Sequence, residues 1–236
     1  MAATLLLAAF FAAIAVGTAG ADRRHFSWTY EPQVLKRGEA ELEGYTTFTA
    51  DRLKQTRGRT AAEMQLELET GMTDRFDFAV YQVFAQSPGE PFYYEGYKLR
   101  FRYRVGTNSR FTSAPVAYVE YKGRPDFSTE AIETKIILGR DLGALRLALN
   151  PGLEIEQEDG DWEAKPEYAA GLTWRFSEMA SFGVEAKGNA DAHSVGPVIG
   201  HGVAGLWVTL GSLIRVSDAD KGPELQTRML LGVKVH

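Results

Sequence analysis

The stretch from Tyr97 to Gly106, YKLRFRYRVG, alternates charged and apolar side chains one by one. Its cations are Lys98, Arg100, Arg102 and Arg104, and between them stand Leu99, Phe101, Tyr103 and Val105. Side chains repeat every two residues in a β-strand but every 3.6 residues in an α-helix, so only a strand separates these two sets onto opposite faces. The stretch therefore predicts a strand whose cationic and apolar faces meet different surroundings.

The same two-residue period recurs from residue 39 to the end of the chain. It predicts about twelve strands, near residues 39–50, 60–72, 75–86, 95–106, 115–123, 130–140, 144–157, 164–177, 180–188, 194–201, 204–217 and 225–236. The faces of the ninth to eleventh strands stay open, because in 204–217 both faces carry apolar residues. Longer connections rich in Pro, Gly and charge alternate with tight turns, which is typical of an antiparallel up-and-down barrel with both termini on the short-turn side.

Alternation alone does not say which face points outward. A soluble lipocalin-like barrel or a sandwich would turn the apolar face inward. Three features favour a transmembrane barrel instead: aromatic residues beside expected short turns, a strand number too large for a barrel filled with Leu and Val, and runs of about 9 to 13 residues, which suit tilted strands in a bilayer. The aromatic residues in question are Phe76, Phe78, Tyr168, Trp174, Phe176 and Phe182. We therefore expect the apolar face to meet lipid.

The charged face then lines the lumen, and it supplies the candidate functional residues. This lumen charge ladder consists of Glu41, Glu43, Glu63, Glu67, Glu69, Lys98, Arg100, Arg102 and Arg104. The small Ala79, on the strand between the acidic and basic parts, leaves space for the long cations to reach the carboxylates. The ladder either braces and solvates the lumen or also orients a polar solute by a transverse field.

Charge and the N-terminus restrict partners and location. The net charge of −5 comes from 31 acidic and 26 basic residues without a basic block, so nucleic acid is not an expected partner. The apolar run LLLAAFFAAIAVG, followed by small residues up to Ala21, predicts a signal peptide over residues 1–21, although a buried helix is the alternative. We expect export through the periplasm to a bacterial outer membrane, a polar lead-in over 22–38 that either plugs the barrel or stays in the periplasm, and a barrel over 39–236.

Three segments carry a resemblance to a known family: FSWTYEPQVLKRGEAELEGYTTF, ELETGMTDRFDFAVY and YEGYKLRFRYRV, together with the closing strands GLWVTLG and LLGVKV. They resemble small proteobacterial outer-membrane barrels of the family named for the MetA pathway of phenol degradation, whose members are described as transporters. The expected partners are outer-membrane lipid, the barrel assembly machinery and a small-molecule solute. The C-terminal His236 departs from the pattern, because such barrels usually end in an aromatic residue.

The chain offers little sign of catalysis. His193 and Ser194 are adjacent, so a strand points them to opposite faces and a Ser–His hydrogen bond between them is geometrically poor. With no cysteine, thiolate metal sites and Cys nucleophiles are excluded, and we expect neither a metal nor a cofactor. The expected function is a narrow channel or uptake protein for small solutes. A structural barrel without transport and an outer-membrane lipid-modifying enzyme are the alternatives.

Overall fold

The computed structural model describes residues 24–54, 56–108, 113–158, 160–203, 205–217 and 222–235. The expected signal peptide, residues 1–21, and the terminal His236 lie outside these ranges. Among the described residues there is no helix with the length and apolar character needed to cross a membrane.

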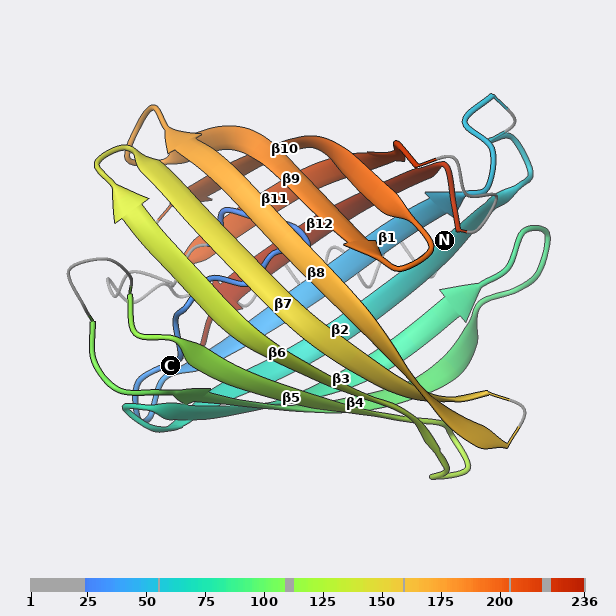
Figure 1. Ribbon diagram of the computed structural model, residues 1–236, viewed down its shortest axis with the longest axis horizontal. Helices are drawn as coiled ribbons and strands as arrows, with labels where there is room; N and C mark the ends of the chain where they lie inside the picture. Colours follow the sequence, from blue (N-terminus) through green and yellow to red (C-terminus); the bar gives the residue numbers. More distant parts are fainter. Residues whose placement is uncertain are drawn as a thin grey trace.

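Twelve antiparallel strands of the described chain close into a barrel (Figure 1). They are β1 (Ala40–Ala50), β2 (Thr60–Thr73), β3 (Phe76–Gln86), β4 (Tyr93–Arg104), β5 (Val116–Gly123), β6 (Thr129–Leu142), β7 (Leu145–Glu158), β8 (Asp161–Arg175), β9 (Ala180–Asn189), β10 (His193–Val203), β11 (Leu206–Arg215) and β12 (Leu225–Lys234). Each strand pairs with the next, and β12 closes the ring against β1, with Tyr45 opposite Leu230. The predicted all-β, up-and-down barrel of about twelve strands is confirmed, with strand ends shifted by up to three residues.

Two ends of the barrel are distinguished by their connections. The loop side carries the connections that follow β1, β3, β5, β7, β9 and β11, and the turn side carries those that follow the even-numbered strands. Most turn-side connections are short, such as the one between β2 and β3, and the longest there joins β4 to β5 over residues 105–115. β4 ends two residues earlier than the sequence predicts, just before Gly106, whose φ of 73° breaks the extended backbone.

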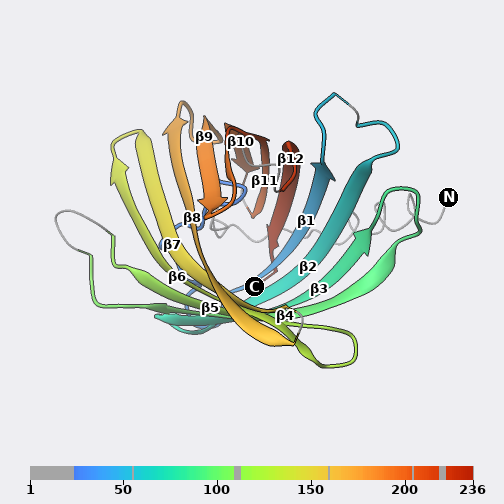
Figure 2. The ribbon, with the colours of Figure 1, turned by 45° about the vertical axis from the view of Figure 1, so that its right-hand side comes forward.

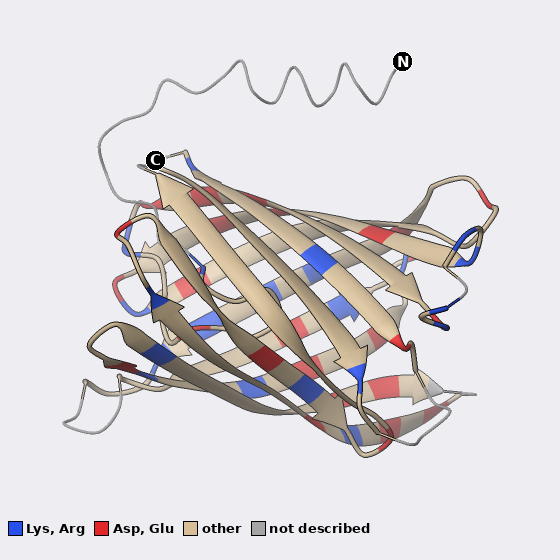
Figure 3. Ribbon diagram, turned by 90° about the horizontal axis from the view of Figure 1, so that it is seen from above, with Lys and Arg blue, Asp and Glu red and all other residues tan. Residues whose placement is uncertain are grey.

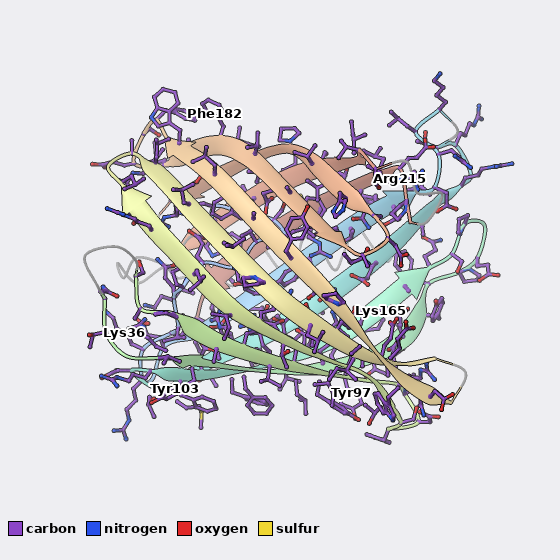
Figure 4. All side chains as sticks on the ribbon, in the orientation of Figure 1. Lys36, Tyr97, Tyr103, Lys165, Phe182 and Arg215 are labelled. Carbon is purple, nitrogen blue, oxygen red and sulfur yellow. The ribbon has the colours of Figure 1, made fainter. Side chains whose placement is uncertain are left out.

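The apolar face of the strands points outward. On β2, Leu66 and Leu68 are 47% and 53% exposed, while the alternating Glu67 and Glu69 are 0% and 2% exposed. Figure 4 shows Tyr103 and Phe182 pointing away from the barrel on different sides of the wall. An apolar outer surface around a polar interior is the arrangement of a membrane barrel and the reverse of a soluble one.

Aromatic side chains gather near both ends of this outer surface. On the turn side, Trp174, Phe176 and Phe182 contact one another at ring-centroid distances of 5.5–6.3 Å. On the loop side, which the sequence analysis did not single out, Tyr97 contacts Phe127 at 6.0 Å. Such paired belts mark the two interfaces of a membrane.

One residue of the expected turn-side belt is misplaced. Tyr168 lies in the interior of β8, seven residues from the strand's turn-side end, and its hydroxyl is 3.2 Å from Nδ1 of His193. His193 begins β10 on the loop side. The error arose because residue spacing gives a face but does not give a height along a tilted strand.

Candidate functional site

The described lead-in, residues 24–38, lies inside the barrel, and we call it the plug. Figure 2 shows this N-terminal blue segment within the ring of strands. Phe26, Ser27 and Thr29 are each at most 1% exposed. The plug starts against β11, where the carbonyl oxygen of Arg24 accepts a hydrogen bond from Thr209. It returns to the turn side, where Gly38 N–H donates to the carbonyl of Gly71 on β2.

A single wall carboxylate holds the first arm of the plug. Glu185 on β9 accepts hydrogen bonds from the backbone N–H groups of Ser27, Trp28 and Thr29, each at 2.9 Å, and from the Ser27 hydroxyl at 2.5 Å. Three consecutive amides aimed at one carboxylate satisfy backbone groups that have no strand partner. Glu185 is therefore the main anchor of the plug.

Further anchors hold the returning arm. The side-chain amide of Asn150 on β7 accepts from the Tyr30 N–H at 2.6 Å and donates to the Tyr30 carbonyl at 2.9 Å. Asp77 on β3 accepts from the N–H of Leu35 at 3.0 Å. These contacts replace the β-ladder that the extended plug backbone lacks.

An ionic anchor holds Glu31 of the plug. Its carboxylate accepts hydrogen bonds from the His25 N–H at 2.9 Å and from Arg146 Nη1 at 2.6 Å. Burial alone would raise the pKa of Glu31, but the hydrogen bonds and charges of His25 and Arg146 outweigh it and lower that pKa to about 2. The docked plug therefore favours an ionised Glu31.

The wall is hollowed to receive the plug by glycines that face inward on four strands. An ideal Cβ on Gly139 would lie 2.7 Å from Pro32 Cδ. On Gly171 it would lie 2.3 Å from Phe26 Cε1, and on Gly211 it would lie 2.0 Å from Ser27 Oγ. On Gly71 it would lie 1.9 Å from the Lys36 carbonyl oxygen. Glycines at lumen-facing positions, where charged residues otherwise stand, are the sequence signal that could have revealed the plug.

The plug also resolves the faces that the sequence left open. Trp207 and Leu213 on β11, each 1% exposed, face the lumen, and Val198 on β10 packs with Phe26 of the plug. Inward apolar residues are tolerated there because the plug covers part of this wall. Both faces of β10 and β11 therefore carry apolar residues.

On the turn side, the predicted ladder forms a closed ionic network. Arg100, which is 0% exposed, bonds to Glu69 and lies 2.6 Å from Glu67. It reaches them across Ala79, its neighbour on β3. Arg102 contacts Asp77 at 2.7 Å and also Glu69. Each buried charge in this network therefore has an opposite charge close by, which buried ions need.

The other ladder residues lie around this network. Glu41 accepts a hydrogen bond from the Trp207 indole at 2.6 Å, and Glu43 accepts one from Arg24 of the plug at 3.0 Å. Arg104 lies at the turn-side end of β4, opposite buried Val116. The two remaining members, Glu63 and Lys98, lie on the loop side (Figure 3 shows charges of both signs along the strands).

The loop-side half of the lumen is hollow. A cavity of about 210 Å³ has the plug residues Trp28 and Tyr30 in its lining. Its charged lining is net basic: Lys98, Lys122, Lys135, Lys187 and Arg228 against Glu120, Glu133 and Glu167. An adjoining cavity of about 200 Å³ shares Lys98 and Lys122 and is net acidic, with Glu63, Glu95, Glu130, Glu154 and Glu156.

Tyr30 of the plug lies at the boundary between the two halves. It lines both the 210 Å³ cavity and a cavity of about 30 Å³ on the turn side, where Arg24, Glu69 and Arg102 also contribute. The Tyr30 ring packs on Tyr118 at 5.0 Å, and the Arg24 guanidinium lies 4.5 Å from its centroid. Tyr30 therefore forms part of the floor of the loop-side cavity.

The described residues hold no group of three or more His, Asp or Glu side chains placed to bind a metal ion. His193 contacts Tyr168 on the exposed face, whereas the adjacent Ser194 lines a cavity beside Lys187. The pair is thus split between the two faces of β10.

No family model and no curated protein matches this sequence. Among solved structures, it resembles the NanC porin at 9% identity and a TM-score of 0.56, over 82% of this chain and 98% of that one. The chain has the porin fold. An outer membrane channel from Pseudomonas putida F1 is similar at 11% identity and a TM-score of 0.58, over 86% of this chain and 97% of that one.

Proposed function

We propose that this protein is an outer-membrane channel for small polar solutes whose lumen is closed by its own plug. The observation that carries the proposal is the position of Tyr30, between a charged loop-side cavity and the turn side of the lumen. A barrel that served only as structure would need neither the charged cavity nor a wall whose inward glycines make room for the plug.

The way the plug is held supports a channel that opens. Glu185, Asn150 and Asp77 hold it mainly through hydrogen bonds to its backbone. Water can replace such bonds when the plug leaves, at a net cost of about 0.5–1.5 kcal/mol for each neutral bond and about 1.5–3 kcal/mol for each bond to a charged group. The two similar structures, a porin and an outer membrane channel, agree with this function.

The setting proposed for the channel follows from the sequence. The signal peptide over residues 1–21 directs export through the periplasm, and the barrel assembly machinery inserts the strands into outer-membrane lipid. Within this setting, we place the chain among the barrels named for the MetA pathway of phenol degradation, on the resemblance of its strand sequences.

We also propose that the barrel is not an enzyme. The separation of His193 and Ser194 onto opposite faces supports this, because a hydroxyl nucleophile needs its base within hydrogen-bond reach. Lipid turnover by the purified protein that disappears in His193→Ala would reverse this part of the proposal.

The channel is tested by planar-bilayer recording of the purified full chain beside a Glu185→Ala/Asn150→Ala variant. Loss of these two anchors weakens the hold on the plug, so the variant is expected to show an open probability several times that of the wild type. An Asp126→Ala/Gln157→Ala variant is the matched control, because Asp126 bonds within its own loop and neither residue lines the two loop-side cavities. Heat-modifiable migration on gels verifies that each barrel is folded. If the folded wild type and the folded anchor variant both pass no current, the protein is a structural barrel and not a channel.

A further inference from the structure

Two cations lie close to one aromatic ring of the plug. Lys187 Nζ on β9 is 5.6 Å from the centroid of Trp28, and the Arg228 guanidinium on β12 is 5.4 Å from it. All three residues line the 210 Å³ cavity. The arrangement brings wall and plug together at one place, with two positive charges near a flat apolar surface.

Lys187 differs from the other lysines of the cavity. Lys122 and Lys135 each contact two carboxylates, and Lys98 lies 3.6 Å from Glu120. Lys187 has no carboxylate within 4 Å in the described chain, and its strand neighbours are Ala169 and Ser194. It is thus a half-buried ammonium group without an ion-pair partner.

Arg228 and Trp28, which lie beside Lys187, also have hydrogen-bond donors that lack an acceptor in the described part of the chain. Arg228 donates its Nε–H to Thr47 at 2.9 Å, but its nearest carboxylate, Glu63, is 4.0 Å away. The Trp28 indole N–H is buried and finds no acceptor among the described residues. Cations removed from bulk water are unfavourable unless an opposite charge or water meets them. Lys187 and Arg228 together therefore create a place suited to an anion.

We propose that this cavity binds a small organic carboxylate, with its charged group between Lys187 and Arg228 and its body against the Trp28 ring. The inference rests on the proposed channel function and names the class of solute that the channel takes. The cavity volume of about 210 Å³ lies below the roughly 300–1,000 Å³ of sites for drug-sized ligands, which fits a solute of one ring or fewer.

The test is isothermal titration calorimetry on the purified full chain in detergent at low ionic strength, with sodium glucuronate and glucose as probes. The two sugars differ chiefly in the carboxylate. We expect glucuronate to bind and glucose to give no signal. Lys187→Gln and Arg228→Gln are each expected to weaken glucuronate binding by about tenfold or more, since each removes a charge-assisted hydrogen bond.

Two controls keep the result specific. Lys165→Gln removes the same charge from neighbouring β8 but at a lysine that pairs with Glu156 and Glu163, and it should bind glucuronate like the wild type. Glucuronate should also change the tryptophan fluorescence of the wild type, and Trp28→Phe should abolish that change. Equal binding of the two sugars, or unaltered binding in Lys187→Gln, would overturn the proposal.

The carboxylate site and the channel function can be tested independently. Wild-type protein that binds glucuronate but passes no current, with or without its plug anchors, would retain the carboxylate site and remove the channel. Protein that conducts but does not bind glucuronate would retain the channel and remove the carboxylate site.

Discussion

The two halves of the lumen use similar residues for different purposes. On β4, Arg100 and Arg102 are 0% and 8% exposed and lie in the turn-side network with Glu67, Glu69 and Asp77. Lys98, two residues away on the same face, lines the loop-side cavity at 3.6 Å from Glu120. A guanidinium spreads its charge over several fixed donors, whereas an ammonium on a flexible stem stays adaptable. On β4, the two arginines therefore brace the wall, whereas Lys98 lies at the surface of the cavity.

The largest expected difference is in stability. Arg100→Gln leaves two buried carboxylates without their common partner, and breaking a buried ion network costs about 3–5 kcal/mol. Lys98→Gln should cost less, because Lys98 lies 3.6 Å from a single carboxylate, Glu120, which also accepts a hydrogen bond from the Tyr118 hydroxyl. Urea unfolding in detergent, followed by tryptophan fluorescence, measures both. Equal losses would mean that the two halves do not differ in the way described.

The next largest effect is a pH dependence of the free energy with which the plug docks. A carboxyl whose pKa is lower in the docked plug stabilises docking above its usual pKa of 4.5, and that contribution is lost as the pH falls toward about 2. The contribution is on the order of 3 kcal/mol at most, from the lowered pKa of Glu31.

Wild-type conductance should therefore rise as the pH falls from about 4.5 toward 2. Glu31→Gln should already conduct more at neutral pH and show little further rise. An identical acid response in wild type and Glu31→Gln would assign the effect to other carboxyls.

A smaller effect tests the fit between wall and plug. Gly171→Ala places a Cβ 2.3 Å from the Phe26 ring, and overpacking of this kind costs about 1–3 kcal/mol. Because the plug can move away, amide hydrogen exchange should quicken over residues 24–36 and not in the strands. Gly44→Ala, where no atom lies within 4 Å of the new Cβ, is the matched control and should leave exchange unchanged. Equal protection of the plug amides in both variants would contradict the claim that Gly171 leaves room for the Phe26 ring.

The smallest effect concerns ion selectivity. Lys98→Glu reverses one charge of the net basic loop-side cavity, so in the Glu185→Ala/Asn150→Ala background the reversal potential in a salt gradient should shift toward that of cations. Lys54→Glu makes the same charge reversal on the exposed loop after β1, outside that cavity, and serves as the control. The same reversal potential before and after the Lys98 change would leave the ladder with a bracing role only.

Much of the barrel could be predicted because one period organises it. The alternation in β2 and β4 is strict, since lipid meets one face and ionic partners meet the other. The same reasoning brought Arg100 and Glu69 onto one wall, with Ala79 between them. Local sequence was sufficient for these features because strand pairing fixes which residues are neighbours.

The plug could not be predicted in this way. Its contacts join Ser27 to Glu185, 158 residues apart, through backbone amides that every sequence possesses. The lack of an ion-pair partner at Lys187 depends on where Glu63 and Glu167 point, which strand spacing does not give. Inward Gly171 and Gly211 carried the signal, but a glycine in a strand also marks bulges and bends.

A disulfide lock between plug and wall tests the central claim, that the plug closes the lumen. An ideal Cβ on Gly211 lies 3.1 Å from Ser27 Cβ, near the spacing of about 3.5–4.5 Å that a disulfide needs, and the chain has no other cysteine. The pair Ser27→Cys and Gly211→Cys is introduced into the Glu185→Ala/Asn150→Ala variant and recorded in planar bilayers. We expect no current after oxidation and restored current after a thiol reductant is added. Equal currents in both redox states would contradict the claim.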